Sequence, residues 1–86
     1  MNIYYSPKFA KEYKRLSSQT KKLAEKREKI FRINPSHPSL KTHKLTGHLE
    51  GFWSFSINYK NRIVFEFVDA NTVHFHSVGT HQIYKQ

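Results

Sequence analysis

Two histidines, a tyrosine and two cations flank three strand-like runs in the C-terminal half of the sequence. His43 and Lys44 precede the first run, Arg62 begins the middle run, and His81 and Tyr84 follow the last one. These residue types suit cleavage of an RNA phosphodiester, in which a base takes the 2′-hydroxyl proton, cations stabilise the developing charge and an acid protonates the leaving 5′-oxygen. Imidazole can serve as base or acid near neutral pH, and arginine grips phosphate through a bidentate fork. The chemistry requires a fold that brings these residues together.

The three runs cover residues 52–58, 62–68 and 72–78, and each alternates apolar with polar side chains. Alternation at period two, rich in aromatic and β-branched residues, predicts half-buried antiparallel strands. The predicted core face carries Trp53, Phe55, Ile57, Ile63, Phe65, Phe67, Val73 and Phe75. The predicted polar face carries Ser54, Ser56, Asn58, Arg62, Val64, Glu66, Thr72, His74 and His76.

The N-terminal half predicts one short strand and two helices. Residues 3–5 form an apolar run, after which Ser6 and Pro7 suit the cap and the first position of a helix with an apolar stripe. A second helix is expected over about 19–33, and the prolines that follow end it. Residues 40–51 are expected to form a basic loop anchored by its leucines.

This order of elements predicts a single α+β domain over residues 1–86. Strand, two helices, loop and three strands make a β-α-α-β-β-β fold, with a helical hairpin packed on one face of a small antiparallel sheet. A chain of 86 residues can build one modest core and is too short for two.

The charge balance favours an acidic partner. Lys and Arg number 15 against 6 for Asp and Glu, which gives a formal net charge of +9. An excess of this size on a small surface favours nucleic acid, and a simple solubility bias is the alternative. The absence of cysteine excludes disulfides and thiolate metal sites. No signal peptide or membrane-spanning run is evident, so a cytoplasmic protein is expected.

His74 and His76 stand two residues apart, a spacing that can chelate a metal ion. No third ligand accompanies them in the sequence. We therefore interpret both as solvated strand residues and expect no metal or other cofactor.

Four short segments resemble the RelE/ParE superfamily of type II toxin–antitoxin toxins, especially its YoeB and YafQ branches. They are residues 43–47 (His-Lys-Leu-Thr-Gly), 51–54 (Gly-Phe-Trp-Ser), 61–65 (Asn-Arg-Ile-Val-Phe) and 77–81 (Ser-Val-Gly-Thr-His). Their order and spacing, together with the β-α-α-β-β-β order, extend the resemblance over nearly the whole chain.

The resemblance implies a ribosome-dependent mRNA endonuclease, or mRNA interferase, that needs no metal and is neutralised by a cognate antitoxin protein. Arg62 matches the strand arginine that contacts the scissile phosphate in RelE- and YoeB-like toxins. His81 matches the C-terminal catalytic histidine of YafQ-like toxins, and His43 matches another histidine of their site. Tyr84 lies where these toxins often place an aromatic that stacks on a base or assists proton transfer.

The remaining site residues are expected to bind RNA. Lys44 and Lys41 are the predicted phosphate-binding cations, and Ser54, Ser56 and Phe52 are the predicted RNA contacts. Ser54 and Ser56 replace the Lys, Arg or His that relatives carry, so this strand offers less charge. The YoeB-like glutamate base has no clear counterpart, and the nearest candidates, Glu50 and Glu66, fall on other positions.

The sequence leaves other functions and other roles for these residues open. ParE-type members share the fold but inhibit DNA gyrase, and the basic charge alone would also suit a non-catalytic nucleic-acid-binding module. Arg62 could pair with Glu66, His81 could be an ordinary exposed histidine, and Tyr84 could only cover the edge of the core.

Overall fold

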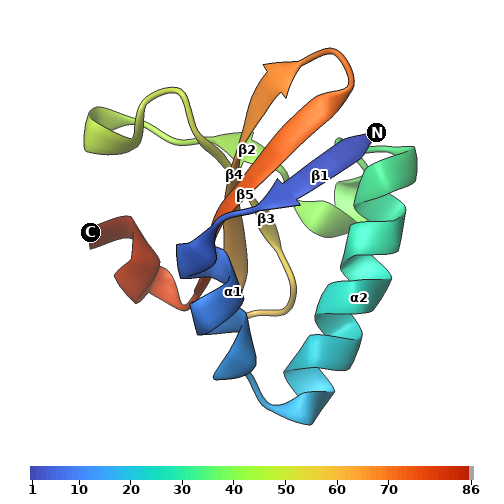
Figure 1. Ribbon diagram of the computed structural model, residues 1–86, viewed down its shortest axis with the longest axis vertical. Coiled ribbons are helices and arrows are strands. Elements are labelled where there is room, and N and C mark those ends of the chain that lie inside the picture. Colours follow the sequence, from blue (N-terminus) through green and yellow to red (C-terminus); the bar gives the residue numbers. More distant parts are fainter. Residues whose placement is uncertain (86) are drawn as a thin grey trace.

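A computed structural model describes residues 1–85, with the side chain of Lys85 excepted (Figure 1). The helices are α1 (Pro7–Lys14) and α2 (Ser18–Ile33). The strands are β1 (Asn2–Tyr5), β2 (His43–Lys44), β3 (Trp53–Ser56), β4 (Arg62–Asp69) and β5 (Thr72–Gly79). Three short 3₁₀ segments complete the chain: η1 (Pro38–Leu40), η2 (Gly47–Leu49) and η3 (His81–Lys85).

The strands form one sheet in the order β1-β5-β4-β3-β2, with both helices on one of its faces. The predicted α+β fold is therefore confirmed. The sheet is mixed, because β1 pairs with β5 in the parallel direction while the other pairs are antiparallel. The two residues of β2 were expected to lie in a loop, but they pair with β3.

Both helices begin after a capping serine, which is the predicted Ser6 for α1 and Ser17 for α2. The Ser6 hydroxyl accepts a hydrogen bond from the Phe9 amide at 2.9 Å, and Pro7 occupies the first helical position. The Ser17 hydroxyl accepts from the Thr20 amide at 3.1 Å. These caps satisfy amides that have no partner within the first turn of a helix.

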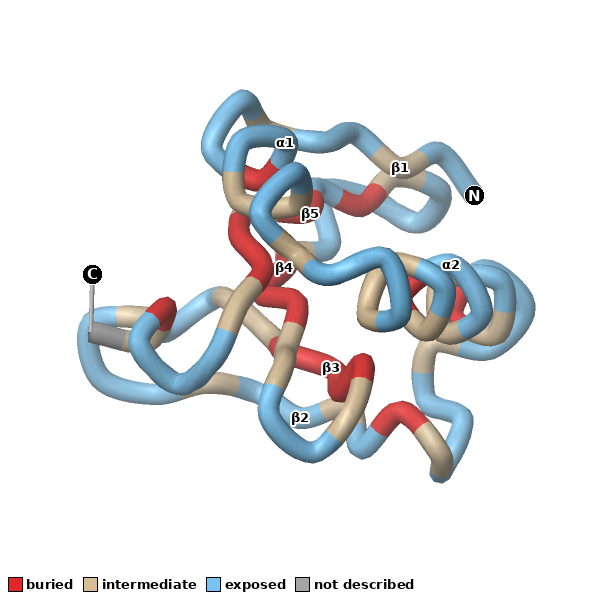
Figure 2. Tube along the Cα trace, turned by 90° about the horizontal axis from the view of Figure 1, so that it is seen from below, coloured by how far each residue is buried: buried red, intermediate tan, exposed pale blue. Residues whose placement is uncertain are grey.

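The core is a cluster of aromatic rings between the helices and the sheet. Phe31 of α2 stacks on Phe55 at 4.8 Å and meets Phe65 edge-on at 4.9 Å, measured between ring centroids. Phe9 of α1 packs against Phe75. Buried residues concentrate along the central strands, where the helices cover them (Figure 2). Pairs of this kind each contribute about 0.5–1.5 kcal/mol beyond the area that they bury.

Two parts of the predicted face assignment need correction. Phe67 was expected in the core but is 43% exposed, because the tip of the β4–β5 hairpin projects past the helices (Figure 1). Val64, expected on an open polar face, is only 3% exposed. The C-terminal segment η3 returns over this second face and buries Ile83 there, so the face away from the helices is partly covered.

Candidate active site

The register of the sheet brings the predicted site residues to one end of the face away from the helices. His43 of β2 pairs with Ser54 of β3. Ser56, two residues further along β3, pairs with Arg62 of β4, which in turn pairs with Gly79 of β5. Residues that alternate along a strand share a face, so His43, Ser54, Ser56 and Arg62 all lie on this side of the sheet.

The segment η3 adds His81 and Tyr84 to the same end. The Tyr84 hydroxyl and the Ser54 hydroxyl are hydrogen-bonded at 3.0 Å, and the His81 ring lies edge-on to the Tyr84 ring at 5.5 Å. Gly79 permits this return, since a Cβ at that position would lie 2.9 Å from a methyl carbon of Ile83. The structure therefore brings His43, Arg62, His81 and Tyr84 into one region.

The backbone fixes the protonation pattern of the His43 ring. Its Nδ1 lies 3.0 Å from the Lys41 carbonyl oxygen. A carbonyl only accepts hydrogen bonds, so Nδ1 must carry the proton. In the neutral ring the lone pair is then on Nε2, which is the arrangement that a general base needs.

Arg62 holds the turn between β3 and β4. Its Nη1 donates to the carbonyl oxygens of Asn58, Tyr59 and Asn61, at 2.6, 3.1 and 3.3 Å. Within the described residues, the side chain that faces Glu66 is His76, at 3.7 Å, rather than Arg62. The other guanidinium nitrogens of Arg62 make no hydrogen bond to the described part of the chain, so they can face a ligand.

Two cavities share Tyr59 and Arg62 at this end of the sheet. One, of about 350 Å³, is also lined by Lys60, Thr80 and His81. The other, of about 280 Å³, is also lined by Arg27, Ser39, Lys41, Ser56, Ile57 and Asn58. Of the described residues that line the two cavities, four are cationic and none is acidic, so the region suits an anion.

The remaining predicted RNA-binding residues lie in different surroundings. Lys41 and Ser56 line the second of these cavities. Ser54 is fully buried beneath Tyr84, and Phe52 meets the His76 ring edge-on further along the same face. Lys44 lies apart from them, because strand alternation places its ammonium over the Trp53 ring, 5.4 Å from the centroid, on the helix side of the sheet.

Sequence reasoning missed Glu12, whose carboxylate supports the end of β5. One oxygen accepts from the Val78 amide at 3.1 Å, and the other pairs with Lys8 at 2.8 Å. It also missed Arg27, Tyr59 and Lys60 as lining residues. No local pattern singles out these residues, since their position depends on how α1, α2 and the β3–β4 turn pack.

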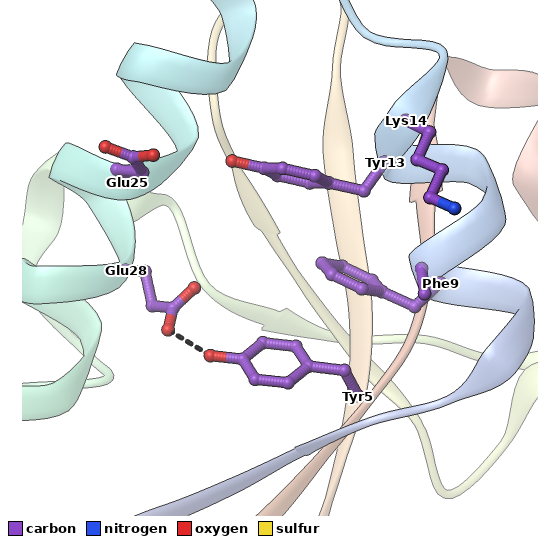
Figure 3. Close-up of a pocket in the computed structure, with 7 residues that line it drawn as sticks. Tyr5, Phe9, Tyr13, Lys14, Glu25 and Glu28 are labelled. Carbon is purple, nitrogen blue, oxygen red and sulfur yellow. Dashed lines mark hydrogen bonds between the residues drawn. The ribbon is translucent and has the colours of Figure 1, made fainter.

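Another cavity, of about 510 Å³, lies away from this region, between α1 and α2. Tyr5, Phe9 and Tyr13 line one side of it and face Glu25 and Glu28 of α2 (Figure 3). It contains none of the predicted catalytic residues. Across residues 1–85, the described side chains form no cluster of three potential metal ligands, and no helix is long and apolar enough to cross a membrane.

No family model matches the sequence, and no curated protein matches it either. Solved structures do match the fold. The YoeB dimer of Staphylococcus aureus is 28% identical over 94% of this chain and 97% of its own, with a TM-score of 0.77. YafQ of Escherichia coli strain BL21(DE3) is 20% identical over 99% of this chain and 98% of its own, with a TM-score of 0.75. A YoeB/ParE toxin of Agrobacterium tumefaciens is 16% identical over 94% of this chain and 99% of its own, with a TM-score of 0.80.

The chain shares its fold with the YoeB and YafQ toxins, as expected for a RelE/ParE-superfamily protein. The resemblance drawn from the sequence is thereby confirmed. Among the RelE/ParE relatives, S. aureus YoeB is also known in a complex with YefM, and E. coli YafQ in a toxin–antitoxin complex with DinJ.

Proposed function

We propose that this protein is the toxin of a type II toxin–antitoxin pair and cleaves mRNA on the ribosome, without a metal ion. The observation that carries the proposal is the convergence of His43, Arg62, His81 and Tyr84 at one cationic end of the sheet. The 28% identity to S. aureus YoeB over almost the full length supports it.

The proposed reaction is attack of the RNA 2′-hydroxyl oxygen on the adjacent phosphorus. His43 takes the 2′-hydroxyl proton on Nε2 as the new P–O2′ bond forms. Arg62, with Lys41 and Lys60 nearby, stabilises the negative charge on the phosphorane oxygens. The P–O5′ bond then breaks and His81 protonates the departing 5′-oxygen, which leaves a 2′,3′-cyclic phosphate and a 5′-hydroxyl.

Tyr84 is assigned a positioning role. Its hydrogen bond to Ser54 fixes the ring, and the ring lies against His81. The imidazole therefore has a rigid neighbour that limits its orientations. We assign Lys44 no phosphate contact, because it lies over Trp53 on the other face.

The proposed partner besides the ribosome-bound mRNA is a cognate antitoxin, in the cytoplasm. The antitoxin complexes of YoeB and YafQ support a partner of this kind. An acidic segment would complement Arg27, Lys41, Lys60 and Arg62 and would block access to the histidines.

The test is a cell-free bacterial translation reaction in which mRNA ends are mapped by primer extension. The protein should cut within codons only when ribosomes are present, and adding the product of the adjacent open reading frame should stop it. His81→Ala should remove the cuts. His74→Ala, which changes an exposed histidine on β5 away from the site, should keep them.

Intact mRNA with the unaltered protein would overturn the proposal. The next assay would then be DNA gyrase supercoiling, since ParE-type toxins share the fold. Inhibition that survives His81→Ala would identify a ParE-like binder, and RNA binding without cleavage or gyrase inhibition would identify a non-catalytic module.

A further inference from the structure

A smaller cavity on the same face of the sheet has no role in the proposed cleavage step. It has a volume of about 180 Å³. Its lining residues come from α1, the η2 loop, β4, β5 and η3, and they are Lys8, Leu49, Phe52, Val64, His76, Ser77 and Ile83. Five separate parts of the chain therefore converge to form it.

The cavity adjoins the candidate active site. Val64, which lines it, pairs with Ser54, and Ser54 is the hydrogen-bond partner of Tyr84. Neighbouring strands lie about 4.8 Å apart, so the cavity begins about one strand away from the contact that holds Tyr84. Ile83, the residue before Tyr84, forms part of its wall.

The lining combines apolar walls with a few polar groups. Phe52, Val64 and Ile83 supply apolar surface. Ser77 is only 5% exposed and places its hydroxyl group in the lining of the cavity. The His76 ring stands edge-on to Phe52, with ring centroids 4.7 Å apart. Apolar surface with a small number of placed polar groups is the composition of a small-molecule site.

This composition fits a nucleobase better than a phosphate or a sugar. A base has two apolar faces and a polar edge, and proteins recognise unpaired bases by packing aromatic rings against the faces and hydrogen-bonding the edge. A phosphate would leave the apolar walls unused, whereas the cations that suit phosphate line the neighbouring cavities at Arg62.

We propose that this cavity binds a nucleobase of the single-stranded mRNA close to the scissile phosphate. Phe52 and Ile83 would pack against the base, and Ser77 and His76 would hydrogen-bond to its edge. The inference rests on the proposed function, since it assigns a specificity subsite to the same substrate. Base preference next to the cut would then be set partly by this chain.

NMR titration of the free protein tests the subsite without the ribosome. The probes are the four nucleosides, the four nucleoside monophosphates and inorganic phosphate. Nucleosides and nucleotides should shift the signals of Phe52, Ser77 and Ile83, whereas inorganic phosphate should shift those around Arg62 and His81 only. If nucleotides shift only the signals that phosphate also shifts, the subsite is wrong, whatever the protein does on the ribosome.

Cleavage mapping provides the second test. Stacking on one aromatic side chain predicts that Phe52→Ala lowers kcat/KM by about 5-fold to 150-fold and weakens the base preference beside the cut. Phe52→Leu, which keeps an apolar contact, should retain the fold and still lose base preference. Tyr4→Ala, which removes an exposed ring from β1, is the matched control. An unchanged cut profile in Phe52→Ala would overturn the subsite while leaving the proposed function standing.

Discussion

At the scale of single residues, the hydrogen bond between His43 Nδ1 and the Lys41 carbonyl puts the lone pair of the neutral ring on Nε2, and the proposed reaction uses His43 as the base and His81 as the acid. A base must be neutral and an acid must be protonated, so we expect kcat/KM for mRNA cleavage to follow a bell-shaped pH profile. His43→Ala should lower the rate by about 10²- to 10⁴-fold and remove the acidic limb of the profile. His74→Ala should keep both limbs. An acidic limb that persists in His43→Ala would assign the base to another group.

Residue types alone could not predict which way the side chains of the candidate site face. His43 and Lys44 are adjacent in the sequence and equally plausible as RNA contacts, yet strand pairing sends them to opposite faces. The sequence could not show this, because a strand of two residues has no alternation pattern to recognise. Ser54 likewise is a polar residue of the kind usually found at the surface, and only the return of Tyr84 buries it.

At the scale of elements, α1 completes the edge of β5 where β1 ends. The Ser6 amide donates to the Phe75 carbonyl at 3.0 Å, and the Ser6 hydroxyl donates to the His76 carbonyl at 2.7 Å. The Glu12 carboxylate then accepts from the Val78 amide, three residues before His81. Helix α1 thus supplies hydrogen-bonding groups that a neighbouring strand would otherwise provide, and it holds the segment that leads to the candidate site.

Removing the Glu12 carboxylate should therefore loosen the end of β5. Glu12→Ala leaves a partly buried amide without its acceptor, and we expect it to lower the free energy of unfolding by about 1–3 kcal/mol in urea denaturation. Hydrogen exchange of the Val78 amide should become faster. Glu12→Gln keeps an acceptor oxygen, so its free energy of unfolding should fall less than that of Glu12→Ala. Lys8→Ala removes only the exposed ion pair and should cost about 0.2–0.5 kcal/mol. Equal losses in Glu12→Ala and Lys8→Ala would contradict this role for the Val78 contact.

At the scale of the whole molecule, periodicity predicted the layers but not every pairing. The alternation of residues 52–78, the apolar stripe of the first helix and the Ser6 cap were sufficient to predict a helical hairpin on a sheet. The parallel pairing of β1 with β5 joins segments about 70 residues apart, and no local pattern encodes its direction. The cover that η3 places over the second face was also missed, because His81 to Tyr84 offer only one buried apolar side chain, Ile83.

A contact between β1 and α2 couples the stability of the whole molecule to alkaline pH. The Tyr5 hydroxyl donates a hydrogen bond to Glu28 (Figure 3). The same Glu28 carboxylate accepts a hydrogen bond from Arg32. Partial burial raises the pKa of Tyr5 above its ordinary value of 10.0, and the hydrogen bond and the charge of Glu28 raise this pKa further, against the opposing effect of Arg32. A pKa raised by folding means that the neutral phenol is favoured in the folded state. Its stabilising contribution is then complete below the ordinary pKa and is lost as the pH rises through the folded value.

We therefore expect the free energy of unfolding to fall as the pH rises above the ordinary tyrosine pKa of 10.0, and to fall less steeply in Tyr5→Phe, which has no phenol to ionise at this contact. Glu28→Gln keeps an acceptor but removes the carboxylate charge, so the slope of its unfolding free energy with pH should lie between those of the unaltered protein and Tyr5→Phe. Burial and the charges of Glu25 and Glu28 also raise the pKa of Tyr13, so part of the slope should persist in Tyr5→Phe and should be absent when both tyrosines are replaced. Urea denaturation at a series of pH values measures these slopes. Parallel curves for the unaltered protein and Tyr5→Phe would show that the contact with Glu28 does not persist in solution.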